Sequence, residues 1–152
     1  MQSSFDGLPL TGFPQPEWNN AHSVSDALRA TQSASTKEAS SSAYDKLLYA
    51  LGNNHAGTYY PVALVAVPAL ETILREGQFW AKSAALNVLI ELCGSFEPEP
   101  EFEVFNGEPL SSALLQKVAA FLPVIEGLAV TTDVVGRSAS DLVDAMKDVS
   151  LP

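Results

Sequence analysis

The residue types that most often carry catalysis are scarce in this chain of 152 residues, which has two histidines and one cysteine, Cys93. The chain has no HExxH, CxxC, P-loop or GxSxG element, so metal, phosphate and acyl-transfer chemistry have no motif to rest on. Cys93 lies on the apolar face of a predicted helix just before Gly94, which is typical of a buried thiol. The sequence therefore favours a protein that is not an enzyme and that holds no cofactor or metal ion.

The most informative functional feature is an acidic loop predicted for residues 95–109. Between Ser95 and Glu108 it contains five acids and no base, namely Glu97, Glu99, Glu101, Glu103 and Glu108. Its prolines favour an extended chain, in which alternate residues project to one side, so the first four glutamates would form a single edge. Phe96 and Phe102 would anchor the loop to the domain. Two interpretations stay open: a solvated loop that keeps an apolar protein in solution, and a recognition edge for a basic surface.

A second candidate site is the turn around Asn53, Asn54 and His55, which is followed by Tyr59. In the structural interpretation, these polar side chains hydrogen-bond backbone groups at the ends of two neighbouring helices. In the functional interpretation, the same four residues border a surface for a ligand or a protein partner. The residue types fit both interpretations.

The elements that must position these residues are predicted to be helices, because apolar residues recur at helical spacing along most of the chain. Thr36 is the expected N-cap of the helix that ends before Gly52, and Ser138 resembles the start of the last helix. Residues 1–20, with three prolines among apolar residues, are expected to form an extended arm on the domain. The fold class is all-α, with helices predicted over residues 23–32, 37–51, 59–76 and 79–93, from 111 or 112 onward, and from 138 onward.

Two prolines in one apolar helical segment, Pro61 and Pro68, indicate how the helices are built. If Thr58 is the N-cap, Pro61 lies in the first turn, where its missing N–H has no intrahelical partner to lose. Pro68 removes the hydrogen bond to the carbonyl of Leu64, so it is expected to kink the helix or to split it.

An internal repeat places these prolines in a larger pattern. A shift of 55 residues aligns VPALETIL at 67–74 with LPVIEGLA at 122–129, with the prolines and glutamates in register. Each unit reads as a proline-kinked helix, a turn and a second amphipathic helix, with units at about 44–95 and 110–149. Such helix pairs stack because neither pair can bury its apolar face alone. We therefore expect one helical domain over residues 21–152, preceded by the arm.

A helix pair of roughly 40 residues is the size of a HEAT or armadillo repeat. The stretch from Leu51 to Glu71 also resembles a group of small bacterial HEAT-like proteins, in which a His-x-Gly-x-x-Tyr-Pro element precedes an Ala-rich Val-Pro helix; this chain has His55, Gly57, Tyr60 and Pro61 in that pattern. The resemblance covers residues 44–95, is weaker over 110–149 and does not include 1–35. It implies a short right-handed α-solenoid of HEAT-like stacked helix pairs with proline-kinked first helices. Some members of the group resemble immunity proteins that neutralise toxins in competition between bacteria.

The charge balance restricts the partner. With 18 acids and 8 bases the net charge is -10, which disfavours nucleic acid and anionic membranes and favours a protein with a basic surface. The N-terminal residues lack the basic and apolar regions of a signal peptide, and the longest apolar run, 12 residues from Tyr59 to Leu70, is shorter than a membrane span. A single cysteine excludes an internal disulfide and fits a reducing compartment. We expect a cytoplasmic protein.

Three functions stay open from the sequence alone. The first is a protein-binding module, most concretely an immunity protein that blocks a basic toxin acting in the cytoplasm through the acidic loop. The second is a structural or assembly component that self-associates through apolar helix faces, because two repeats are few for a solenoid. The third is a helical-repeat protein that binds a small ligand or acts on it, near Asn53–Tyr60.

Overall fold

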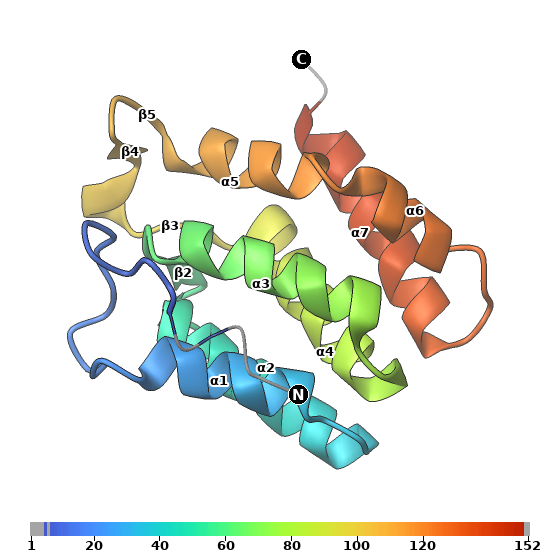
Figure 1. Cartoon of the computed structure of the whole chain (residues 1–152). Helices are drawn as coiled ribbons and strands as arrows, with labels where there is room; N and C mark the ends of the chain where they lie inside the picture. The colour runs from blue at the N-terminus through green and yellow to red at the C-terminus, as the bar shows by residue number, and fades with distance from the viewer. Residues whose placement is uncertain (1–4, 6, 151–152) are drawn as a thin grey trace.

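The computed structural model describes residue 5 and residues 7–150, and over these the chain is mainly helical, as the sequence predicts (Figure 1). Five short strands of two residues each accompany the helices in this part of the chain. The α-helices of the described residues are α1 (Ser23–Gln32), α2 (Lys37–Leu51), α3 (Ala63–Glu76), α4 (Phe79–Ile90), α5 (Leu110–Ala119), α6 (Leu122–Leu128) and α7 (Val134–Ser150).

The helices are arranged around α4. Helices α1 and α2 pack on each other on one side of α4, α3 lies beside it, and α6 and α7 pack together on the other side (Figure 1). Seven of the twelve residues of α4 are buried, and three of these are alanines, so neighbouring helices approach it closely from several directions. A helix that is apolar on all sides is stable in water only when it is covered in this way.

The two aligned prolines have different roles, which corrects the expectation of equivalent kinked helices. Helix α3 runs unbroken from Ala63 to Glu76 with Pro68 inside it, so of the two expected outcomes, a kink or a split, the split does not occur. The helix predicted from Ser111 or Ser112 is interrupted near its proline, as expected: it is divided into α5 and α6, which are bent by 61°, and Pro123 lies in the first turn of α6. Proline is tolerated in a first turn because the N–H groups there have no intrahelical acceptor.

The 55-residue shift holds better for the second helices of the two pairs. Helix α4 begins at Phe79 and α7 at Val134, and 134 − 79 = 55. The predicted start of the last helix at Ser138 is therefore wrong: α7 begins after Asp133, whose carboxylate accepts a hydrogen bond from the N–H of Gly136 at 2.9 Å. That bond, together with one from the hydroxyl of Thr131, lowers the pKa of Asp133.

Among the other helix ends, one agrees with the sequence-based expectation and two differ from it. Thr36 is the N-cap of α2, as predicted, and its hydroxyl oxygen accepts a hydrogen bond from the N–H of Ala39 at 3.0 Å. Thr58, by contrast, lies in a strand and does not cap α3, whose N-cap position is Val62. The α-helix predicted to end at Cys93 ends at Ile90. One π-helical turn follows directly over Glu91–Ser95 and contains Gly94.

Gly52 ends α2, as expected, but for a different reason than helix termination in a left-handed conformation. Its backbone is extended, with φ -179°, and it begins the strand β1 (Gly52–Asn53), which pairs with β2 (Thr58–Tyr59). A Cβ atom on Gly52 would lie 2.1 Å from the carbonyl oxygen of Thr58. Glycine is needed here because the two strands approach too closely for any side chain.

Replacing Gly52 by alanine should therefore lower the free energy of unfolding by roughly 2–3 kcal/mol, because the hairpin has to move off the end of α2. Gly127→Ala is the matched control: Gly127 lies inside α6 with no atom within 4 Å of the added methyl group. This control should raise the free energy of unfolding by about 0.4–1 kcal/mol. Urea unfolding followed by circular dichroism measures both, and equal stability of the two variants would contradict the close approach at Gly52.

Candidate functional site

The short strands, the acidic loop and the arm gather at one end of the helix stack, on the left in Figure 1. The turn between β1 and β2 lies there, and β3 (Glu97–Pro98), the first part of the acidic loop, pairs in parallel with β2. The N–H of Glu97 donates to the carbonyl of Gly57 at 2.9 Å, and the N–H of Glu99 donates to that of Tyr59 at 2.8 Å. The two segments that the sequence singled out are thus neighbours.

The arm completes this end of the molecule. The backbone N–H of Val62 donates to the carbonyl of Pro14 at 3.0 Å, which ties the arm to the segment that leads into α3. The indole N–H of Trp18 donates to the carbonyl of Tyr49 at 2.9 Å, and the side-chain amide of Asn19 donates to the carbonyl of Ala50 at 2.7 Å. Residues far apart in the sequence are held against the end of α2 by these bonds.

Four aromatic rings form a row across the arm, α2 and the acidic loop. Trp18 stacks on Tyr49 with ring centroids 5.2 Å apart, and Tyr60 lies next to Trp18 at 6.4 Å and next to Phe102 at 5.5 Å. Trp18 is 40% exposed and Tyr49 is 50% exposed, which is high for large aromatic side chains. We call Tyr49, Trp18, Tyr60 and Phe102 the aromatic row. No sequence pattern indicates this row, because its members are far apart along the chain.

Three carboxylates act on Tyr60, one of the inner rings of the aromatic row. Burial raises the pKa of Tyr60, and the negative charges of Glu99, Glu101 and Glu17 raise it further, which places all three near its hydroxyl. Glu99 also accepts a hydrogen bond from the hydroxyl of Thr58 at 2.5 Å, so its position is fixed. Together with the exposed Glu97 and Glu103, these carboxylates and the aromatic row make up what we call the acidic–aromatic end.

Basic residues are missing from the segments that build this end. The sequence has no lysine or arginine in residues 1–22, 47–74 or 83–116. The base at its border is Lys46 on α2, which lines a small hollow together with Trp18, Tyr49 and Asp26. The acidic–aromatic end therefore has one sign of charge across its hairpin and loop, with no internal ion pairs to neutralise it.

The acidic loop does not have the uninterrupted extended shape expected from its prolines. A 3₁₀ turn at Pro100–Phe102 breaks the extended path between Glu99 and Glu103, so the four glutamates are not on one straight edge. A hairpin of β4 (Val104–Phe105) and β5 (Glu108–Pro109) follows and carries the exposed Glu108. Phe96 and Phe102 both pack against the hydrophobic core, as their predicted anchoring role requires.

The turn at Asn53–Tyr59 is divided between structural roles and surface. The side-chain oxygen of Asn53 accepts hydrogen bonds from the N–H groups of His55 and Ala56, both at 3.1 Å, which closes the turn. Tyr59 is 1% exposed and belongs to the hydrophobic core, so in this conformation its side chain packs beneath the surface and does not reach a partner. His55 is exposed beside the acidic loop, and the side-chain oxygen of Asn54 is buried without a hydrogen-bond partner among the described residues.

Cys93 is buried, and burial raises the pKa of its thiol to about 12, which keeps it protonated near neutral pH. No group of three or more His, Cys, Asp or Glu in the described residues is placed to hold a metal ion. No single helix among those described is long and apolar enough to cross a membrane; α5 and α6 reach that length and composition only as a bent pair.

Comparisons of this chain with models of protein families, with curated proteins and with solved structures give no match.

Proposed function

We propose that this protein is a non-catalytic protein-binding module that recognises a basic protein surface through its acidic–aromatic end. The observation that carries the proposal is the combination of one-signed charge and exposed aromatic rings at one end of the helix stack. Trp18 and Tyr49 are exposed there, beside carboxylates from both the arm and the acidic loop. The side chains that match this combination best are those of arginine and lysine.

Arginine fits both parts of the surface. Its guanidinium group can bind a carboxylate through two parallel hydrogen bonds and can stack on an aromatic face at the same time. The net charge of -10 would attract a basic partner over a distance and increase its rate of association. The aromatic row would then provide most of the short-range binding energy, as exposed aromatic residues commonly do at interfaces.

The acidic–aromatic end is held in place before any partner binds. The β-pairing of the acidic loop with β2, and the hydrogen bonds from Trp18 and Asn19 to the end of α2, fix its three segments relative to one another. A surface that is ordered in advance loses less conformational entropy on binding. This favours recognition of a folded partner with a complementary basic patch.

The scaffold in this proposal is a short HEAT-like solenoid. Three pairs, α1 with α2, α3 with α4, and α6 with α7, lie next to one another with α4 in contact with both flanking pairs. The starts of α4 and α7 are 55 residues apart, and the same shift aligns the segments 67–74 and 122–129. This agreement supports two related units. A right-handed stack of such pairs with proline-containing first helices is the architecture that we propose.

The most concrete form of the proposal is an immunity protein that blocks a toxin acting in the cytoplasm. An enzyme that attacks an anionic substrate needs a cationic active site, and a fixed acidic–aromatic surface could occupy such a site in place of the substrate. The support for this form is the charge of the site together with the resemblance of residues 44–95 to small bacterial HEAT-like proteins.

The role of the acidic loop can be tested by changing Glu97, Glu101 and Glu103 to glutamine, with Glu99 kept because it holds the hairpin. The matched control changes the exposed Glu38, Glu76 and Glu126 instead, so both variants go from a net charge of -10 to -7, since -10 + 3 = -7. In pull-downs from a lysate of the source cells, the loop variant should lose a basic partner that the wild type and the control variant retain. Capture by the wild type should weaken at high salt.

If the captured partner is a toxin, its expression alone should stop growth, and co-expression of the wild-type protein should restore growth. Equal capture by the loop variant and the control would remove the acidic loop from the proposal. Recovery of only this chain, in an oligomer that persists on dilution in light scattering, would replace the proposal with self-association.

The aromatic row makes a separate prediction. Tyr49→Ala should weaken binding of the captured partner by about 30-fold, which corresponds to the loss of about 2 kcal/mol at an aromatic contact of the interface. Phe79→Ala is the control, because Phe79 is an exposed aromatic residue at the start of α4, away from the acidic–aromatic end. Isothermal titration calorimetry measures both, and equal effects of the two changes would contradict a specific role for the row.

A further inference from the structure

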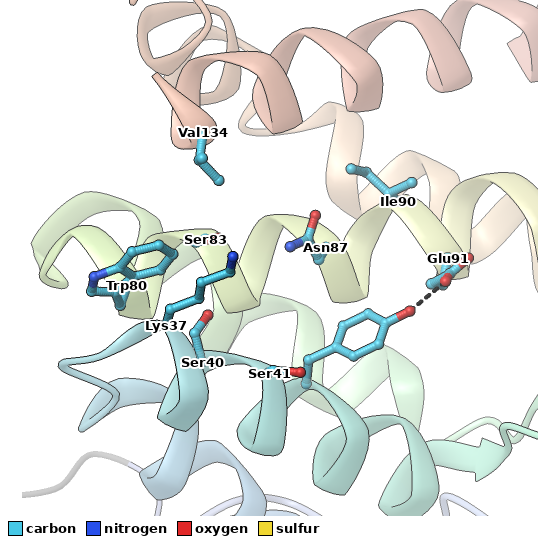
Figure 2. A pocket seen from close by; sticks show the side chains of 10 residues that line it. Lys37, Ser40, Ser41, Trp80, Ser83, Asn87, Ile90, Glu91 and Val134 are labelled. Carbon is cyan, nitrogen blue, oxygen red and sulfur yellow. Dashed lines mark hydrogen bonds between the residues drawn. The ribbon is translucent and has the colours of Figure 1, made fainter. Parts of the chain in front are cut away.

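A second site is separate from the acidic–aromatic end. A cleft of about 370 Å³ lies between α2, α4 and the start of α7, and this volume is within the range typical of small-molecule pockets (Figure 2). Its lining mixes polar side chains with Trp80, Ile90 and Val134. Lys37, at the beginning of α2, lines this cleft, whereas the acidic–aromatic end lies at the last turn of the same helix, about 20 Å away at 1.5 Å per residue.

Hydrogen-bond donors without a partner collect at one end of the cleft. Lys37 forms no ion pair with any described residue, and its ammonium group extends toward α4 (Figure 2). Ser40 and Ser83 are 5% and 3% exposed, and neither hydroxyl makes a hydrogen bond within the described chain. Both residues line the cleft, and their hydroxyls are not among the fully buried unpartnered atoms of the described chain, so they are open to an occupant of the cleft. A ligand that supplies acceptor atoms would suit this group of donors.

Asn87 adds a further donor to the same place. Its side-chain oxygen accepts a hydrogen bond from the hydroxyl of Ser138 on α7 at 3.2 Å, which fixes the orientation of the amide. The amide nitrogen is left to donate, and it is turned toward Lys37 (Figure 2). The cleft thus presents an ammonium group, two hydroxyls and an amide N–H₂ to the same region.

The one carboxylate in the lining is at the other end of the cleft. Both oxygens of Glu91 accept hydrogen bonds, one from the hydroxyl of Tyr44 and one from the hydroxyl of Ser95, at 2.6 Å for Ser95. Tyr44 follows Lys37 by seven residues on α2, which is about 10 Å along the helix. The charge of Glu91 is therefore already stabilised and is well separated from the donors around Lys37.

We infer that this cleft binds a small organic anion whose carboxylate or phosphate group lies between Lys37, Ser40, Ser83 and Asn87. The apolar body of the ligand lies against Trp80 and Val134, which line the cleft at the same end as Lys37 (Figure 2). Charge-assisted hydrogen bonds from a lysine are stronger than neutral ones, so the charged head group provides selectivity over neutral analogues. A protein with a net charge of -10 needs such a local arrangement to hold an anion at all.

The test uses three probes with the same ring and different head groups: benzoate, phenyl phosphate and the neutral analogue benzamide. Each is titrated into ¹⁵N-labelled full-length protein and followed by the NMR signals of the Asn87 side-chain amide, the Trp80 indole and the Ser83 backbone. We expect saturable shifts of these signals with benzoate or phenyl phosphate, and binding of benzamide that is at least about tenfold weaker. The tighter of the two anionic probes identifies the head group as carboxylate or phosphate.

Two variants locate the site. Lys37→Gln should weaken binding of the anionic probe by about tenfold or more, whereas Lys46→Gln should leave it unchanged, because Lys46 is an exposed lysine on the same helix that does not line the cleft. Ser83→Ala should weaken binding severalfold without loss of the helical signal. Any of three results would overturn the inference: no saturable shift with either anion, equal binding of benzamide, or equal effects of Lys37→Gln and Lys46→Gln.

Discussion

The burial of α4 is the constraint on which the rest of the structure depends. Its apolar and small residues have to be covered on several sides, and α1, α2, α3 and α7 provide that cover. Because α2 and α7 both pack on α4, the cleft between them and the row of donors in it are consequences of how this one helix is enclosed. The same packing brings the ends of α2 and α3 together, where the hairpin, the arm and the acidic loop meet.

The sequence predicted the helical elements well where a local signal was present. Thr36 marked the start of α2 because an N-cap works through the backbone of the next three residues. The starts of α4 and α7 follow the 55-residue shift, although the capping pattern at Ser138 predicted a later start for the last helix, and the alignment treated Pro68 and Pro123 as equivalent. A proline has different effects in a first turn and in a helix interior, and tertiary packing decided which of these applied at each position.

The two sites were predictable to different degrees. The acidic loop is visible in composition alone, and its neighbours are not, because the pairing of Thr58 with Glu97 joins residues that no local pattern connects. The aromatic row depends on contacts such as that of Trp18 with Tyr49, 31 residues apart. The cleft has no motif at all: Lys37 and Ser83 come from different helices, and each looks like an ordinary helix residue in isolation.

The attachment of the arm has a consequence for how the acidic–aromatic end is assembled and lost. Its backbone and side-chain bonds reach Val62, Tyr49 and Ala50, so the arm can dock only after the ends of α2 and α3 have been formed. Glu17 and Trp18 both belong to this segment, whose described residues, 5 and 7–20, form no helix or strand. A proteolytic cut that released the arm would thus remove a carboxylate and one inner ring of the aromatic row, and it would also take Phe5 out of the hydrophobic core.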